Sequence, residues 1–400
     1  MKRRSLSALR PALVHHWMEH FRGGEAVLEQ FGLLFPAAPI SIMVYRWENL
    51  SASLQRHRFK TSLLHYLPWV RNRFRHLLPF FPEIVRGMRV RRDARFVLSS
   101  DASMIKGIGI PEGAVHVCYC HSPPRYLWGM EEAYLQSSSH NGSLFRKLYA
   151  AITPRLRRFD HASAQRVDRF IANSRCVQER ILRHYGRASE VIYPPVDVDA
   201  FDPARPREDF FLIVSALVPY KRVDLAVQAC ARLGKRLVVI GTGPEMKNLT
   251  PLASATISFL GWQSSAVVRD HFERCRALLF PGIEDFGITP CEAQAAGAPV
   301  IAFAMGGALE TVRDGVTGLF FTTQTVNALE DCLQRFDALP PFSSEACRAN
   351  VEHLRPARFR RNMRDFLARE FPHLFAHHPW PADAEPARAP ASAAMTAPLS

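Results

Sequence analysis

The sequence predicts an α/β protein of two domains, each built on a parallel sheet. Its 400 residues exceed one ordinary domain, and 48% hydrophobic with 22% charged residues is typical of a globular chain that buries sizeable cores. Short apolar strands alternate with helical segments along most of the chain, which is the pattern of βαβ units. Such sheets bind ligands at the carboxyl ends of their strands, so the residues that follow each strand are the candidates for a site.

The clearest unit spans residues 277–307 and consists of a strand, a glycine-bearing loop, a helix and a second strand. Thr289 predicts the N-cap of that helix, with Pro290 in its first turn. Glu292 then falls three residues after the cap, where a capping box would place it. This position gives Glu292 a purely structural explanation.

The loop of this unit has no such structural explanation. Glu284 lies in the loop just past the apolar strand and has no capping task. The backbone N–H groups of Phe286, Gly287 and Ile288 would face an anion or a sugar oxygen at the helix start. Two carboxylates and several free amides around one strand end suit a ligand rich in hydroxyl groups.

The first half of the chain supplies the elements of the N-terminal domain. Its predicted strands lie at residues 12–16, 40–45, 94–99, 116–120 and 168–174, and its predicted helices at 159–167 and 175–185. Gly23 and Gly24 open a further helix, where backbone amides can approach a phosphate, although glycine pairs also serve as plain turns. His121 follows a strand and is a candidate ligand for a sugar hydroxyl or a phosphate, with a structural role as the alternative.

The second half repeats the alternation more regularly. Strands are predicted at residues 210–214, 236–240, 257–261, 277–280 and 299–303, and helices at 224–233, 264–275 and 355–370. Lys221 lies in the loop after the first of these strands and is a candidate phosphate ligand. Gly241 and Gly243 follow the second strand but lack the rest of a dinucleotide fingerprint, and no GxxxxGK[ST] loop occurs. Dehydrogenase and P-loop functions are therefore disfavoured.

The excess positive charge lies entirely in the first half of the chain. Residues 1–200 hold 30 Lys and Arg against 16 Asp and Glu, whereas residues 201–400 hold 21 of each. A basic half suits nucleic acid or an anionic membrane surface. Residues 71–82 interleave arginines with large apolar side chains, which fits lipid head groups or an amphipathic helix packed on its own domain. We find no nucleic-acid-binding motif and expect no nucleic-acid partner.

The remaining composition indicates a cytoplasmic protein. The eight cysteines are scattered without a CxxC pair, so we expect free thiols rather than disulfides or a metal site. No apolar run approaches the roughly 20 residues of a membrane span, and the basic N-terminus lacks a secretory cleavage site.

Taken together, these motifs resemble those of the retaining glycosyltransferases of family 4. Glu284 and Glu292 match the family's Glu-x7-Glu motif, and the supporting motifs occur in the family's order. They are Gly23-Gly24-Glu25, His121, 170–174, 191–197, 218–222, 241–244 and Gly306-Gly307 with Glu310. The resemblance covers the chain to about residue 370 and implies the GT-B fold, in which two Rossmann-like domains have parallel sheets that face one another across a cleft.

The resemblance implies a division of the chain into domains. We expect an N-terminal acceptor-binding domain at residues 1–195 and a C-terminal nucleotide-sugar-binding domain at 196–355. A helix at 356–375 would cross back to the N-terminal domain, and the Pro- and Ala-rich tail at 376–400 would be disordered.

The amino-acid sequence of residues 118–126 and 217–222 is similar to the corresponding segments of bacterial mannosyltransferases that build O-antigen and exopolysaccharide. That branch implies GDP-mannose as donor, a polyprenyl-diphosphate-linked saccharide as acceptor, and a peripheral position on the inner face of the cytoplasmic membrane. A UDP-sugar donor, a non-catalytic sugar-nucleotide-binding subunit and another enzyme of the same fold, such as an epimerase or a phosphorylase, are the alternatives.

The family's roles carry over to matching positions of this sequence. Glu292 would bind the ribose hydroxyls, and Glu284 would bind the donor sugar. Lys221 would neutralise the diphosphate, and His121 would lie near the donor sugar and the acceptor. We take His121, Glu284 and Lys221 as catalytic residues, and the wider donor-binding set as Gly23, Gly24, Lys221, Arg222, Gly241, Gly243, Glu284, Phe286, Gly287, Ile288 and Glu292. The family implies no metal and no cofactor beyond the nucleotide sugar.

Two features depart from the family pattern. Many relatives have an arginine five residues before the phosphate-binding lysine, where this chain has Ala216, and Arg222 is a candidate to compensate. Relatives in this branch also often have Asp where His16 stands and an acidic residue near Gly129. We expect these changes to affect donor affinity or acceptor position.

Overall fold

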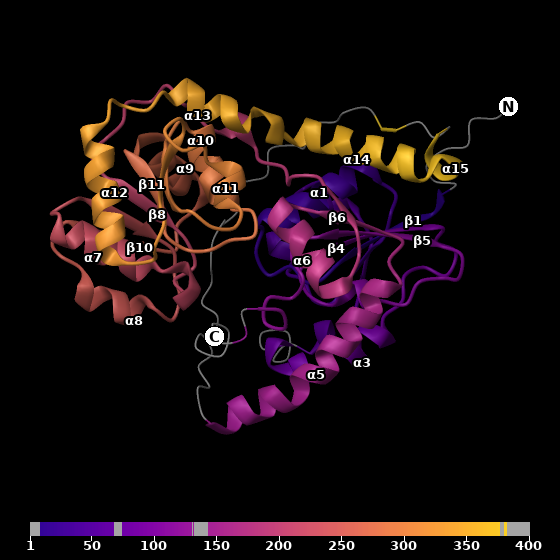
Figure 1. Cartoon of the computed structure of the whole chain (residues 1–400). Coiled ribbons are helices and arrows are strands. Elements are labelled where there is room, and N and C mark those ends of the chain that lie inside the picture. The colour runs from indigo at the N-terminus through magenta and orange to yellow at the C-terminus, as the bar shows by residue number, and fades with distance from the viewer. Residues whose placement is uncertain (1–8, 68–73, 130, 132–142, 377–379, 382–400) are drawn as a thin grey trace. The chain divides into compact units, whose positions relative to one another are not determined.

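The computed structural model describes residues 9–67, 74–129, 131, 143–376 and 380–381, which form two compact units (Figure 1). The first unit runs to Pro195 and includes the segment that begins at Pro356. The second unit comprises Val196–Arg355. Most of the tail predicted to be disordered lies outside the described residues.

The first unit contains a seven-stranded sheet in the order β3-β2-β1-β4-β5-β6-β7, and every pair is parallel. Its strands are β1 (Pro11–His15), β2 (Ile40–Ile42), β3 (Phe59–Thr61), β4 (Phe96–Asp101), β5 (Val115–Cys120), β6 (Arg169–Ala172) and β7 (Ser189–Val191). Its helices are α1 (Gly23–Leu34), α3 (Phe81–Gly87), α5 (Ser143–Gln165), α6 (Arg175–Tyr185), α14 (Pro356–Glu370) and α15 (Pro372–Phe375). The central strands β1 and β4 are buried throughout, as a parallel sheet covered on both faces requires.

The second unit contains a six-stranded sheet in the order β10-β9-β8-β11-β12-β13, again entirely parallel. Its strands are β8 (Phe211–Val214), β9 (Leu237–Ile240), β10 (Ile257–Gly261), β11 (Ala277–Phe280), β12 (Val300–Phe303) and β13 (Gly318–Phe321). Its helices are α7 (Val223–Arg232), α8 (Met246–Leu249), α9 (Ser265–Arg274), α10 (Ile288–Ala295), α11 (Ala308–Thr311), α12 (Val326–Ala338) and α13 (Ser344–Val351). The prediction of two Rossmann-like domains with parallel sheets is therefore confirmed.

Each sheet has one point at which the strand order reverses. In the first unit the chain builds outward from β1 to β3 and then returns to place β4 on the other side of β1. In the second unit β8 and β11 are neighbours in the same way. The loops that follow two such strands diverge, which leaves a crevice outside their carboxyl ends. The candidate ligand sites are therefore the loops after β1 and β4 in the first unit and those after β8 and β11 in the second.

Local chemistry explains where several elements begin and end. Ser174 caps α6 by accepting a hydrogen bond from the Val177 N–H at 3.0 Å, and Gly186 ends the helix in the left-handed region at φ 64°. The helix predicted at 159–167 is longer, because α5 begins at Ser143. The sequence analysis also missed β3, β7 and β13, which have three, three and four residues and therefore show little alternation.

Helix α14 returns the chain to the first unit, where it packs on α1 (Figure 1). Its Phe359 is buried and stacks on Phe31 of α1 with ring centroids 6.0 Å apart. Arg360 is also buried and donates from Nη1 to Gln30 Oε1 at 2.5 Å. The first unit therefore depends on a segment that follows the second unit in sequence.

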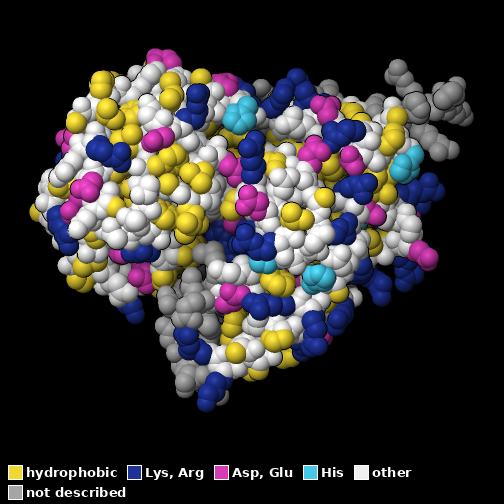
Figure 2. Space-filling model, viewed as in Figure 1, with side chains coloured by type: hydrophobic (Ala, Val, Ile, Leu, Met, Phe, Trp, Pro, Cys, Tyr) yellow, Lys and Arg dark blue, Asp and Glu magenta, His cyan; other side chains and the backbone are white. Residues whose placement is uncertain are grey.

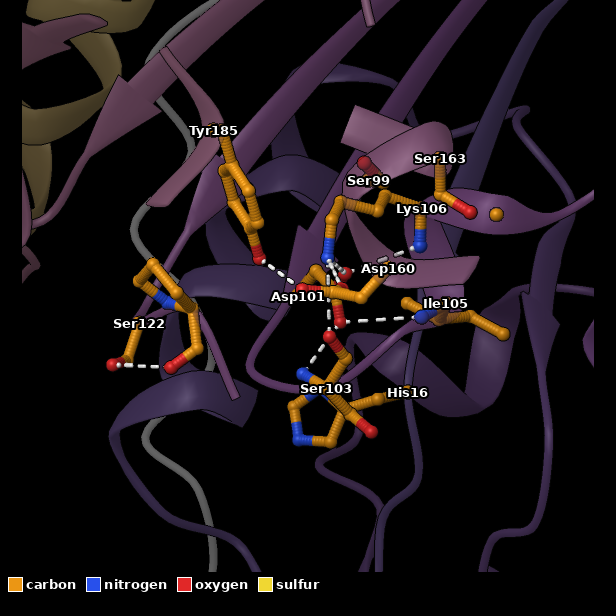
Figure 3. A network of polar contacts seen from close by, with 12 residues as sticks. His16, Ser99, Asp101, Ser103, Ile105, Lys106, Ser122, Asp160, Ser163 and Tyr185 are labelled. Atoms are coloured by element: carbon orange, nitrogen blue, oxygen red, sulfur yellow. Dashed lines mark hydrogen bonds and ion pairs between the residues drawn. The ribbon is translucent and has the colours of Figure 1, made fainter. Parts of the chain in front are cut away.

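A buried ion-pair network fixes the carboxyl end of β4. The ammonium group of Lys106 pairs with Asp160 of α5 and lies 3.3 Å from Asp101 Oδ2 (Figure 3). Tyr185 and Trp128 donate to Asp160 at 2.7 and 2.8 Å. Burial alone would lower the pKa of Lys106, but Asp160, Tyr185 and Asp101 raise it well above its usual value. The lysine therefore stays charged inside the unit.

Removing this charge should destabilise the first unit. Lys106→Met leaves two buried carboxylates without their cation, so we expect a loss of about 3–5 kcal/mol in the free energy of unfolding. Urea denaturation measures this loss. Adding Asp160→Asn removes one uncompensated charge and should recover part of it, and a Lys106→Met protein as stable as the native one would contradict the assignment.

Candidate active site

In the second unit, the loops after β8 and β11 bring two predicted site residues together. Lys221 and Glu284 form an ion pair, and their side chains are only 15% and 18% exposed. They come from neighbouring strands at the reversal point of the sheet. Each side chain thus neutralises the charge of the other. An anionic ligand that binds Lys221 would have to compete with the Glu284 carboxylate.

Glycines allow the loops around this pair to approach closely. A Cβ on Gly306 would lie 2.4 Å from the Glu284 carbonyl oxygen, and one on Gly307 would lie 2.3 Å from Phe286 Cα. The Gly307 N–H donates to the same Glu284 carbonyl at 2.8 Å. The loop after β12 therefore supports the Glu284 loop through backbone contacts that any larger residue would prevent.

The start of α10 differs from the predicted one. Gly287 adopts φ 88°, and the helix begins at Ile288, so the prediction that Thr289 is the N-cap is wrong. The glycine can turn the chain in the left-handed region, which lets the helix start before Thr289. Glu292 is then the fifth helical residue and takes no part in a capping box. Its structural explanation is lost.

Glu292 instead presents a desolvated carboxylate. Burial raises its pKa to about 7. Within the described part of the chain, its carboxylate oxygens form no hydrogen bond or ion pair, and burial is the cause of the raised pKa. A carboxylate held in this way is suited to accept hydrogen bonds from ligand hydroxyl groups.

The other predicted donor-binding residues of this unit have clear structural roles. A Cβ on Gly241 would lie 1.8 Å from the Ser215 carbonyl oxygen, and one on Gly243 would lie 2.2 Å from that of Leu217. Arg222 binds Asp224 through two hydrogen bonds of 3.1 Å at the start of α7. These contacts do not test a donor-binding role, which stays a prediction, but compensation for Ala216 would require Arg222 to leave Asp224.

In the first unit, His121 belongs to a polar cluster at the reversal point between β1 and β4. His121 Nε2 lies 2.8 Å from Ser100 Oγ at the end of β4, and Ser100 Oγ lies 3.0 Å from His15 Nδ1 at the end of β1. An ideal Cβ on Gly24 would lie 3.7 Å from His121 Nε2, so the start of α1 faces the same ring. Burial and the neighbouring His15 lower the pKa of His121 to about 4. The imidazole is therefore neutral near pH 7.

The sequence reading missed three members of this cluster. His15 and Ser100 are the polar ends of buried strands, and Glu25 lies in the first turn of α1 with Oε1 3.8 Å from His15 Nε2. The signal was available, because both strands were predicted and polar residues at two carboxyl ends can meet. What the sequence did not show is that β1 and β4 are neighbours.

Within the described residues, no group of three or more His, Cys, Asp and Glu side chains is arranged to hold a metal ion. Within the same residues, no helix combines the length and apolarity that crossing a membrane requires.

Comparisons with known proteins agree with this architecture. Residues 21–200 match the family model of Glycosyltransferase Family 4, and residues 198–350 match that of Glycosyl transferases group 1. Among solved structures, sucrose-phosphate synthase from Thermosynechococcus elongatus superposes with a TM-score of 0.68 at 17% identity, covering 90% of this chain and 100% of that one. Anabaena HepE in complex with UDP and glucose gives 0.62 at 15% identity, covering 89% and 99%.

Curated relatives match a part of the chain. D-inositol 3-phosphate glycosyltransferase of Mycobacterium avium is 33% identical over 188 residues, which is 41% of this chain and 44% of that protein. The enzyme of the same name from Mycobacterium sp. strain KMS is 32% identical over 212 residues, 46% of this chain and 48% of that protein. The chain thus spans less than half the length of these relatives. The two family models together match residues 21–350, so both units are glycosyltransferase domains, and the solved structures share their GT-B fold.

The raised pKa of Glu292 predicts a pH-dependent effect of its removal. The folded protein holds the proton more tightly than the unfolded chain, so this stability is present at low pH and is lost as pH rises through about 7. Glu292→Gln is neutral at every pH. It should therefore be roughly 1–3 kcal/mol more stable than the native protein near pH 8, with no difference near pH 4.

Thermal unfolding at the two pH values measures this difference. A Glu292→Gln offset that does not change with pH would contradict the desolvated carboxylate.

Proposed function

We propose that this protein is a retaining glycosyltransferase that moves a hexose from a nucleotide sugar to a saccharide acceptor. The observation that carries the proposal is the group of Lys221, Glu284 and Glu292 at the reversal point of the second sheet. It combines one cation, two carboxylates and the backbone N–H groups of the first turn of α10, which have no partner within the helix itself. These are the ligands that a diphosphate and a set of sugar hydroxyls require.

Each residue then has a defined task. Lys221 exchanges Glu284 for the diphosphate and stabilises the negative charge that develops as the glycosidic bond breaks. Glu284, released from the ion pair, accepts hydrogen bonds from the donor sugar. Glu292 accepts them from the ribose. The proposal assigns the leaving-group charge to Lys221 and backbone dipoles, so it requires no metal ion.

The first unit supplies the acceptor side of the proposal. His121 is its candidate residue, because the ring is a neutral imidazole that faces the start of α1, where Gly23 and Gly24 remain candidates for the donor diphosphate. A neutral ring can hydrogen-bond a sugar hydroxyl without adding charge. We assign no covalent nucleophile, which agrees with attack of the acceptor on the same face that the diphosphate leaves.

The proposed donor and acceptor rest on sequence resemblance, and the alternatives rest on the solved complexes and the relatives. The resemblance of residues 118–126 and 217–222 to O-antigen and exopolysaccharide mannosyltransferases supports GDP-mannose and a polyprenyl-diphosphate-linked saccharide. The alternative donor is a UDP-sugar, which the complexes of HepE with UDP and UDP-glucose favour. The similarity to D-inositol 3-phosphate glycosyltransferases adds a phosphorylated polyol as an alternative acceptor.

Isothermal titration calorimetry with GDP, UDP, ADP and their sugar conjugates tests this proposal. We expect selective binding of GDP-mannose. Glu292→Ala should weaken binding by about 1.5–3 kcal/mol, because it removes hydrogen bonds between a charged group and the ribose.

The outcomes separate the alternatives. Preference for a UDP-sugar would keep the reaction and change the donor. Glu330→Ala on α12 is the control, because Glu330 pairs with Arg232 and has no role in the proposed site. Binding of none of these ligands by the folded protein would reject the transferase proposal.

We also propose that the first unit lies on the inner face of the cytoplasmic membrane. Large apolar side chains are exposed near the basic segment at 71–82: Leu63 is 84% exposed, Tyr66 72% and Phe80 57%. Other apolar residues of that segment, such as Phe74 and Leu78, are buried in the unit's own core, and residues 71–73 lie outside the described ones. On the face drawn in Figure 2, Lys and Arg side chains of the first unit are scattered among hydrophobic ones.

Vesicle sedimentation tests this placement. Leu63→Ser with Tyr66→Ser should weaken binding to vesicles that contain anionic phosphatidylglycerol by tenfold or more, because each side chain contributes about 1.5–3 kcal/mol when buried. Neutralising the basic set should remove the salt-dependent part of the vesicle-binding free energy, which is about 1 kcal/mol for each charge removed. That set is Arg71, Arg73, Arg75, Arg89, Arg91 and Arg92.

A control variant changes an exposed apolar residue of the second unit, Leu309→Ser. It should bind vesicles as the native protein does. Unchanged binding of both first-unit variants would defeat the proposed membrane surface.

A further inference from the structure

Four polar side chains form a continuous chain in the first unit, and the proposed function uses only its outer member, His121. Ser100 Oγ lies 2.8 Å from His121 Nε2 and 3.0 Å from His15 Nδ1. The His15 ring is fully buried, and its Nε2 has no hydrogen-bond partner but lies 3.8 Å from Glu25 Oε1. The order is Glu25, His15, Ser100, His121.

The direction of this chain follows from the number of protons. A serine hydroxyl has one proton, so Ser100 donates to one ring nitrogen and accepts from the other. The Glu25 carboxylate has no proton to donate, and its charge favours the N–H of His15 on Nε2. His15 Nδ1 then accepts from Ser100, and Ser100 accepts from the Nε2–H of His121.

We propose that Glu25, His15 and Ser100 are positioning residues that hold His121 in its Nε2–H tautomer, so that Nδ1 presents a lone pair to a sugar hydroxyl. No hydrogen bond to Nδ1 is formed within the described residues. The identity of the hydroxyl rests on the proposed function. The tautomer itself does not, because it is set by residues of the free protein.

The surroundings of His121 fit a neutral, oriented ring. Burial and His15 lower its pKa to about 4, against the opposing effects of Glu25 and Asp101. The Tyr119 and His121 rings pack in an edge-to-face arrangement with centroids 5.2 Å apart. The Nδ1–H of His16 donates to the Ser100 carbonyl oxygen at 3.4 Å, which leaves the Ser100 hydroxyl to the other two histidines.

Glu25→Gln provides a sharp test because its new amide has a determined orientation. Glu25 Oε2 accepts a hydrogen bond from the Arg22 N–H at 3.0 Å. In the variant, the amide oxygen can take over that bond, which turns the NH2 group toward His15 Nε2. His15 would then carry its proton on Nδ1, the chain would reverse, and His121 would become the Nδ1–H tautomer.

Nitrogen-15 NMR of the full-length protein labelled at histidine reports the tautomer without any ligand. His121→Gln identifies the resonances of His121. We expect Nε2–H in the native protein and Nδ1–H in Glu25→Gln, and Ser100→Ala should make the His121 tautomer insensitive to Glu25→Gln. Glu29→Gln is the matched control, since Glu29 is buried one turn along α1 and accepts from Ser53 at 2.6 Å; it should leave His121 unchanged.

An activity measurement distinguishes failure of this inference from failure of the proposed function. The probes are GDP-mannose and UDP-glucose, with release of the nucleoside diphosphate as the readout. Glu25→Gln should slow release on the order of tenfold, because a donor replaces the acceptor that the hydroxyl needs. Native protein with Nε2–H but no turnover of either probe would reject the function alone. An Nδ1–H tautomer in the native protein, or one unaltered by Glu25→Gln, would overturn the inference.

Discussion

The structure depends on one constraint, which is the reversal of strand order in each parallel sheet. Because all strands of a sheet run the same way, their carboxyl ends lie on one edge, and the loops of two adjacent strands diverge only where the order reverses. Lys221 and Glu284 follow the two strands at that point in the second unit. His15 and Ser100 end the equivalent strands in the first. Both candidate sites are consequences of topology.

The two sites handle charge in different ways. In the second unit, opposite charges pair at the surface of the site, where a ligand can exchange with one partner. In the first unit, Lys106 and two aspartates pair with one another in the interior, and the carboxylates that act on the neutral His121 ring are Glu25 and Asp101. An exchangeable pair suits a charged diphosphate, and an uncharged ring suits hydroxyl groups.

Glycine has two distinct roles in this chain. Gly241, Gly243, Gly306 and Gly307 are required because a Cβ would collide with a neighbouring backbone, and they shape the loops of the second unit. Gly24 has no collision to avoid, since its Cβ would meet two imidazoles at ordinary contact distance. The absence of a side chain at Gly24 instead leaves space beside the His121 ring. A glycine motif in the sequence therefore does not show whether the glycine is required by a ligand or by a neighbouring loop.

The sequence by itself determined the fold class, most strand positions and the residues of the Glu-x7-Glu motif, because hydrophobic periodicity and cap residues are local properties. Strands β10 and β11 lie at their predicted bounds. Tertiary structure decided what depends on neighbours distant in sequence: the start of α10 at Gly287, which freed Glu292 from capping, and the contact of His15 with Ser100 across 85 positions. The physical reason is that parallel strands are connected by long crossovers. No short stretch of sequence therefore determines which strand ends become neighbours.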